Sequence, residues 1–164
     1  NIGMAGVTVA IVREDLIGDV VPKQPILFDY ATQANNDSMY NTPSTFPWYA
    51  AGRVFEWLKE QGGVKAIEKV NERKANKLYG AIDGSDFYSN PVNPKYRSWM
   101  NVPFILADDS LDKLFLEKSY NANLLALKGH KSVGGMRASI YNSMPEAGVD
   151  KLIEFMTDFE KQYG

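Results

Sequence analysis

The hydrophobic and polar positions of the chain fall into short apolar stretches and helical patterns, separated by turns rich in glycine and asparagine. Residues 7–13 are apolar at nearly every position, which is typical of a strand buried on both faces of a sheet. Apolar residues then recur at helical spacing over 45–61 until Gly62 and Gly63 end the pattern, and a second helical pattern covers 64–80. We therefore predict a buried strand followed by a pair of helices.

The second half of the chain predicts a compact α/β unit. Residues 100–106 alternate as in a half-buried strand, and Pro103 suggests an edge strand or a bulge because proline cannot donate to a ladder. Three further segments complete the unit: a helix that starts at Asp108-Asp109-Ser110, strands over 124–128 and 136–141, and a last helix that opens with the capping box Ser143-Met144-Pro145-Glu146.

These elements predict an α/β fold in two parts, 1–66 and 67–164. The apolar strand over 7–13 needs partner strands on both sides, and the later segments do not supply enough of them. We therefore expect the chain to be part of a larger α/β protein.

Composition narrows the function classes. The chain is 45% hydrophobic and 23% charged, as in an ordinary globular protein, and 18 basic against 20 acidic residues give a net charge of -2. No broad positive field exists to attract nucleic acid or anionic lipid. The absence of cysteine, the single histidine and the lack of a long apolar run argue against metal centres and membrane spans. We expect a cytoplasmic protein with no metal, nucleic-acid or membrane partner.

Candidate chemistry is concentrated between Gly129 and Asn142, where the only histidine, a lysine, a glycine pair and an arginine lie close together. His130 and Lys131 fall on the predicted loop, and Arg137 faces away from the apolar side of the following strand. Arginine offers a carboxylate two parallel donors, so the segment predicts a site for a small molecule with more than one negative group. The alternatives are a surface ion pair for Arg137 and a local hydrogen bond for His130.

A second candidate is the polar segment from Asn41 to Thr45, which precedes a predicted helix. Its amide, hydroxyl and backbone donors could hold a phosphate, although ordinary turn and capping chemistry also explains them. The sequence contains no nucleophile elbow, P-loop or dinucleotide fingerprint, so it gives no support to hydride or phosphoryl transfer.

Three segments, Asn1 to Val12, Asn41-Thr42-Pro43 and His130 to Asn142, together resemble the C-terminal part of the phosphoserine aminotransferase family. This family belongs to the class V, fold type I aminotransferases, which depend on pyridoxal phosphate. In it, the lysine that binds the cofactor directly precedes a segment similar to Asn1-Ile2-Gly3. The resemblance thus implies that the Schiff-base lysine would lie immediately before Asn1 and that this chain contains no catalytic residue.

The resemblance also implies roles for five residues. Asn41 and Thr42 would reach across a homodimer interface to the cofactor phosphate. Arg137 would hold the substrate α-carboxylate, and His130 and Lys131 would hold the distal anionic group. Lys131 stands where the family commonly has arginine, so it keeps the charge and loses the bidentate fork.

The implied fold is the end of a cofactor-binding large domain (1–66) and a small domain (67–164), whose mixed or antiparallel sheet carries helices on one face. The implied activity is transfer of an amino group between glutamate and 3-phosphohydroxypyruvate in serine biosynthesis, by a homodimer, and the chain alone would be inactive. The alternative from another class is a non-catalytic module for binding dianionic metabolites or for dimerisation.

Overall fold

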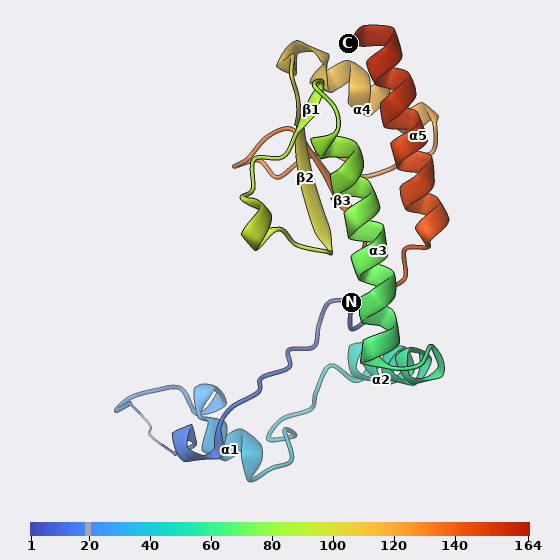
Figure 1. Cartoon of the computed structure of the whole chain (residues 1–164). Coiled ribbons are helices and arrows are strands. Elements are labelled where there is room, and N and C mark those ends of the chain that lie inside the picture. The colour runs from blue at the N-terminus through green and yellow to red at the C-terminus, as the bar shows by residue number, and fades with distance from the viewer. Residues whose placement is uncertain (19–20) are drawn as a thin grey trace. The chain divides into compact units, whose positions relative to one another are not determined.

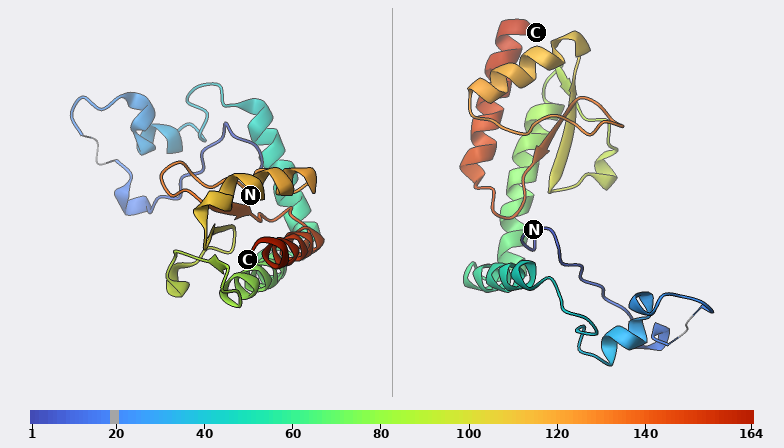
Figure 2. Two further views of the ribbon diagram at one scale, coloured as in Figure 1. Left: turned by 90° about the horizontal axis from the view of Figure 1, so that it is seen from above. Right: turned by 180° about the vertical axis from the view of Figure 1, so that it is seen from behind.

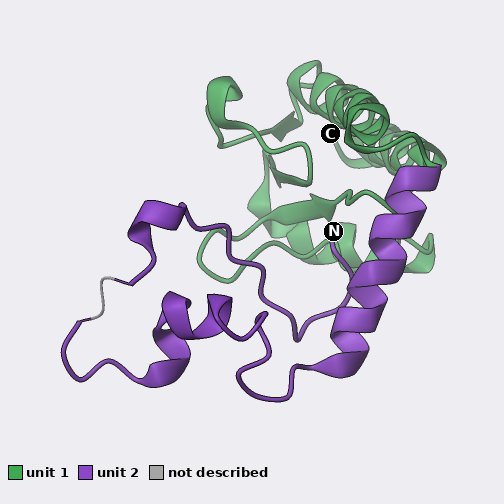
Figure 3. Ribbon diagram, turned by 90° about the horizontal axis from the view of Figure 1, so that it is seen from below, with its two compact units in different colours: residues 1, 61–164 green, residues 2–60 purple. Residues whose placement is uncertain are grey.

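The computed structural model describes residues 1–18 and 21–164 (Figure 1). The chain divides into two compact units, one of residues 2–60 and one of residues 61–164 together with Asn1 (Figure 3). The predicted boundary after residue 66 falls inside helix α3 (Val64–Asp83) of the second unit. The assignment of a cofactor domain and a small domain to the two parts of the chain stays a prediction.

The first unit consists mainly of helices and extended chain. In its described residues, 2–18 and 21–60, the elements are 3-10 helices at Glu14–Leu16 and Ile26–Phe28 and the helices α1 (Tyr30–Ala34) and α2 (Thr45–Glu60). The strand predicted over 7–13 is not formed: the segment has no regular secondary structure, and Ile11 is 97% exposed. An isolated strand leaves its backbone groups unpaired, and the described residues of this unit contain no second strand to pair with it.

The second unit is a three-stranded antiparallel sheet with helices on one face. The strands lie in the order β1-β2-β3, and helices α3 and α5 pack side by side (Figure 2). The bounds of the elements not yet given are β1 (Tyr88–Ser89), a 3-10 helix at Pro94–Tyr96, β2 (Asn101–Leu106), a 3-10 helix at Asp109–Leu111, α4 (Asp112–Asn121), β3 (Met136–Ser139) and α5 (Glu146–Tyr163).

Strand alternation separates a core face from a polar face in this sheet. Val102 and Phe104 of β2 and Met136 and Ala138 of β3 are all buried against the helices. Between them, Arg137 points to the opposite face, as the alternation predicted. The predicted strand over 124–128 is reduced to one bridge between Lys128 and Met136.

Pro103 does not lie on an edge strand, as the sequence suggested, because β2 is the central strand of the sheet. Pro103 lies opposite Arg137, whose N–H donates away from β2 to the Leu127 carbonyl at 2.7 Å. The Pro103–Arg137 pair therefore needs no backbone hydrogen bond across β2 and β3. On its other side β2 pairs with β1 only at Ile105 and Leu106, so the missing N–H of Pro103 disrupts neither ladder.

The capping box predicted at the start of α5 is also absent. Helix α5 begins at Glu146, its N-cap is Pro145, and no side chain caps it. Glu146 instead accepts from Lys77 on α3 at 2.9 Å, and hydrogen bonding to Lys77 lowers the pKa of its carboxyl. Pairing between helices has replaced the local cap.

An ion pair attaches the segment between β1 and β2 to α3. The guanidinium of Arg97 donates to both carboxylate oxygens of Asp83 and lies 4.7 Å from the ring centroid of Tyr79. The Tyr79 hydroxyl donates to the Ser98 carbonyl at 2.8 Å. These contacts hold one wall of the pocket described below.

We predict that this pair gives a pH-dependent contribution to stability. The hydrogen bond from Arg97 lowers the pKa of Asp83 below 3.8, so the contribution is present above that pH and is lost as the pH falls through the lowered pKa. In the whole protein, Arg97→Met should lower the melting temperature at pH 7, and the difference from wild type should shrink on acidification below pH 3.8. The same change at Arg53, whose ion pair is exposed, is the control and should have little effect. A difference that is independent of pH would contradict the prediction.

Candidate functional site

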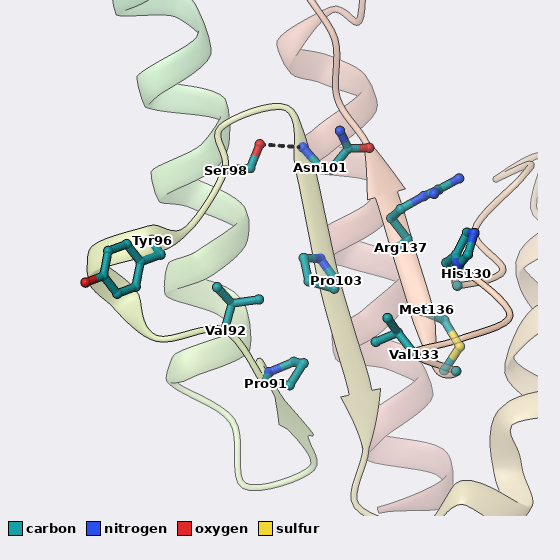
Figure 4. Close-up of a pocket in the computed structure, with 12 residues that line it drawn as sticks. Pro91, Val92, Tyr96, Ser98, Asn101, Pro103, His130, Val133, Met136 and Arg137 are labelled. Atoms are coloured by element: carbon teal, nitrogen blue, oxygen red, sulfur yellow. Dashed lines mark hydrogen bonds between the residues drawn. The ribbon is translucent and has the colours of Figure 1, made fainter.

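The polar face of the sheet carries a pocket of about 280 Å³ over the middle of β2. Pro103 lies beneath it, and its walls are the segment 91–98 and the loop 129–134 (Figure 4). The lining is mainly apolar, with His130 and Arg137 on one side. The lining residues are Pro91, Val92, Tyr96, Ser98, Asn101, Pro103, Gly129, His130, Val133, Gly134, Met136 and Arg137.

Arg137 is the strongest feature of this pocket. Its Nε is buried and has no hydrogen-bond partner among the described residues, and no carboxylate in that part of the chain pairs with its guanidinium. A buried donor without an acceptor costs about 1–3 kcal/mol, so an acceptor from a ligand would relieve a real penalty. The surface ion pair considered from the sequence is therefore absent from the described residues, and the geometry favours an anionic ligand.

His130 makes a local contact that leaves one ring nitrogen for a ligand. Its Nδ1 lies 2.7 Å from the Ser132 hydroxyl and accepts from the Ser132 N–H at 3.3 Å. A neutral ring with Nδ1 as acceptor carries its proton on Nε2, which is then a donor. The local hydrogen bond and a ligand-binding role are thus compatible.

Two glycines allow the loop around His130 to close tightly. The Gly129 N–H donates to the Gly135 carbonyl at 2.8 Å, and a Cβ on Gly129 would lie 2.0 Å from the Gly134 carbonyl oxygen. A Cβ on Gly135, which has φ of 56°, would lie 2.7 Å from the side chain of Ile105. The turn therefore depends on glycine at these positions.

Lys131 lies on the same loop, is exposed and does not line the pocket. None of the twelve lining residues is acidic. The pocket therefore combines the donors of Arg137 and His130 with no negative charge to compete, and the role expected for Lys131 stays a prediction.

Asn41 and Thr42 belong to the other compact unit, just before α2. Both are exposed, the Asn41 amide donates to the Thr42 carbonyl at 3.2 Å, and the Thr42 hydroxyl makes no hydrogen bond in the described part of the chain. Exposed amide and hydroxyl groups are suitable donors to phosphate oxygens, so this donor set fits the phosphate of a cofactor.

Sequence reasoning missed one residue of the pocket and one buried charge outside it. Asn101 lines the pocket, and its Oδ1 accepts from the hydroxyls of Ser139 at 3.4 Å and Tyr141 at 3.3 Å. The alternation over 100–106 places Asn101 on the polar face and could have identified it. Lys74 is fully buried on α3, and nothing in the helical pattern distinguishes it from a surface lysine.

Comparison with known proteins identifies the family. Residues 1–152 match the aminotransferase class-V family. The chain belongs to this family. It is 68% identical over 162 residues to the phosphoserine aminotransferase of Ruthia magnifica subsp. Calyptogena magnifica, covering 99% of the chain and 45% of that protein. The chain thus spans somewhat less than half the length of this class-V relative.

Solved structures agree with this class-V assignment. A phosphoserine aminotransferase structure from a study of radiation damage to its Schiff base matches with a TM-score of 0.94 and 44% identity, over 99% of this chain and 45% of that one. The pyridoxal-phosphate-bound phosphoserine aminotransferase of Trichomonas vaginalis matches with a TM-score of 0.80 and 43% identity, over 84% and 40% of the two chains. The predicted fold class, with an antiparallel sheet and helices on one face, is confirmed.

Across residues 1–18 and 21–164, no helix has both the length and the apolar character needed to cross a membrane. The same part of the chain contains no group of three or more histidine, cysteine, aspartate or glutamate side chains placed to bind a metal ion.

Proposed function

We propose that this chain is the C-terminal part of a phosphoserine aminotransferase that uses pyridoxal phosphate. The observation that carries the proposal is the buried Nε of Arg137, which lacks a partner among the described residues and lies in a pocket with His130 and no acidic residue. The class-V relatives support it, and because the chain covers 45% of their length, the activity is proposed for the whole protein.

The reaction exchanges an amino group for an oxo group. Glutamate becomes 2-oxoglutarate while 3-phosphohydroxypyruvate becomes phosphoserine, and the exchange balances without a further reactant. Both amino-group donor and acceptor carry an α-carboxylate and a second anionic group. Arg137 would hold the α-carboxylate through two parallel N–H donors, and the Nε2 of His130 would donate to the distal anionic group. Lys131 would add positive charge near that group.

The cofactor would be held jointly with parts of the enzyme outside this chain. Asn41 and Thr42 would donate to its phosphate across a homodimer interface, and a lysine immediately before Asn1 would bind it. When bound, pyridoxal phosphate supplies the electron sink that eases cleavage of the substrate's α C–H bond. The location we propose for the whole protein is the cytoplasm.

The proposal predicts a specific chemical result. The whole protein, loaded with pyridoxal phosphate, should form 2-oxoglutarate from glutamate over many turnovers only when 3-phosphohydroxypyruvate is present. With glutamate alone it should form no more than one equivalent per bound cofactor. Borohydride reduction followed by peptide mapping should locate the cofactor on the lysine directly before Asn1. The 164-residue chain, treated in the same way, should give no stoichiometric adduct at any one lysine.

The alternative function, a non-catalytic module that binds dianionic metabolites, predicts different results in these experiments. Calorimetry on the 164-residue chain would then show binding of phosphoserine or glutamate, and the whole protein would bind both without transferring an amino group. A stable cofactor adduct on a lysine within the 164 residues would also contradict the proposal.

A further inference from the structure

Lys74 places a buried positive charge in the middle of α3. The side chain is 0% exposed, and its Nζ donates to the carbonyls of Tyr141 at 2.8 Å, Met144 at 3.0 Å and Ile140 at 3.3 Å. All three ammonium donors are therefore used. Burial lowers the pKa of Lys74, and the nearby carboxylate of Glu146 partly opposes this shift. Because burying a charge is costly, an apolar residue would fill this place more cheaply if packing alone were required.

The segment that Lys74 binds is the direct continuation of the strand that carries Arg137. The last bond of the ladder runs from the Ile140 N–H to the Met100 carbonyl at 2.9 Å. Beyond this bond the chain leaves the sheet, and its hydrogen bonds are then to side chains of α3. Lys74 provides three of them, and Asn71 provides another, because its Nδ2 donates to Asn142 Oδ1 at 2.8 Å. Two side chains about one turn apart on α3 thus fix the backbone between β3 and α5.

Held in this position, the segment contacts the first residue of the chain. The Asn142 N–H donates to Asn1 Oδ1 at 3.1 Å. Under the proposed function, Asn1 directly follows the lysine that binds the cofactor. A continuous set of bonds then joins that lysine's neighbour to the strand that carries the carboxylate-binding Arg137.

We propose that Lys74 is a positioning residue for amino-group transfer: it fixes residues 140–144 so that the Asn142 N–H holds Asn1, and with it the cofactor lysine, in register with Arg137. This inference rests on the proposed function. Lys74 touches neither substrate nor cofactor, and its effect passes through the backbone of the segment it binds.

The first test is Lys74→Met in the whole enzyme. This change keeps an unbranched side chain of similar length and removes all three donors. Misplacing the reacting lysine should lower kcat by about ten- to a hundredfold, because catalysis is sensitive to small errors in position. KM for both substrates should change much less, since β3 remains paired with β2. The pH at which the visible absorbance of the bound cofactor changes should shift, and the Asn142 amide should exchange its hydrogen faster.

Lys77→Met is the matched control, because Lys77 lies three residues further along α3 and is itself exposed, and its ion pairs are with the half-buried Glu146 and the exposed Asp150. It should leave kcat and the cofactor absorbance unchanged.

Asn1→Ala tests the same path without disturbing the buried charge, and it decides the matter if Lys74→Met does not fold. It should lower kcat, shift the absorbance midpoint and speed exchange of the Asn142 amide, with little change in melting temperature. Asn1→Asp keeps an acceptor oxygen and should restore slow exchange at Asn142.

The inference is overturned if Lys74→Met lowers the melting temperature while kcat and the absorbance midpoint stay at wild-type values, or if Asn1→Ala changes none of these measurements. Both results presuppose an active wild-type enzyme. Failure of the wild type to transfer an amino group would instead overturn the proposed function and the inference together.

Discussion

Replacing Arg137 by alanine in the whole enzyme should lower kcat/KM for glutamate and for 3-phosphohydroxypyruvate, chiefly by raising both KM values. A hydrogen bond to a charged group is worth about 1.5–3 kcal/mol, which corresponds to roughly a 10- to 150-fold loss. The value of kcat/KM should fall for both substrates because the α-carboxylate is a group that they share. The buried Nε, which has no acceptor in the described chain, is the physical reason for expecting a large effect.

Two further variants make the Arg137 experiment specific. Arg137→Lys keeps the charge but cannot offer two parallel donors, so it should fall between alanine and wild type. Arg73→Ala, on the exposed surface of α3, removes a weak ion pair to Glu146 and should leave both KM values unchanged. Unchanged steady-state kinetics for Arg137→Ala would refute the assigned role.

Replacing Phe115 by alanine should have the largest effect on stability. Phe115 is 0% exposed, and its ring lies within 6.2 Å of four other rings, measured between centroids. Truncation of a buried phenylalanine removes its transfer free energy and leaves a cavity, at a cost of about 3–5 kcal/mol. The four neighbouring rings come from β1, β2 and α5 and are Tyr88, Phe104, Phe155 and Phe159. They belong to separate elements, so they cannot close the cavity together without moving the sheet against the helices.

Hydrogen exchange of the core amides within residues 61–164 measures this loss, because it reports the free energy of opening of that unit in the whole protein. Tyr120→Ala on the same helix is the control, since that side chain is 68% exposed, and it should change the free energy by no more than about 0.5 kcal/mol. Equal protection in the two variants would show that the aromatic cluster does not hold the unit together.

Local patterns predicted much of the second unit correctly. The helical spacing predicted α3 and α5 there, as it predicted α2 in the first unit, and the alternation over 100–106 and 136–141 predicted β2 and β3 and the direction of Arg137. Such patterns succeed because the core face of an element is set by its own repeat.

Predictions that depended on a neighbouring element were wrong. The apolar run over 7–13 has the composition of a strand, but the described part of its unit offers no partner. Pro103 looked like an edge residue, and it is central because the Arg137 N–H points away from it. The capping box predicted at the start of α5 is not formed, and Glu146 pairs with Lys77 on α3 instead. In each case a contact from elsewhere in the chain decided the outcome.

In the candidate site, too, the residues identified from local patterns were predicted and those placed by distant contacts were not. His130 and Arg137 were identified from residue type and spacing, and the structure places both on one pocket. Asn101 could also have been predicted, because the alternation over 100–106 places it on the polar face of the sheet. Pro91 and Val92, which form the opposite wall, come from a segment whose position depends on the Arg97–Asp83 pair.

Local periodicity and side-chain chemistry were enough to predict the class of elements, the polar face of β3 and the residue types suited to an anion. The burial of Lys74 and the three hydrogen bonds that it donates to the chain beyond β3 depend on tertiary packing instead. A buried lysine and a surface lysine look the same in a helical pattern. The carbonyls that make burial tolerable come from residues 66 to 70 positions away, where no local pattern can show them.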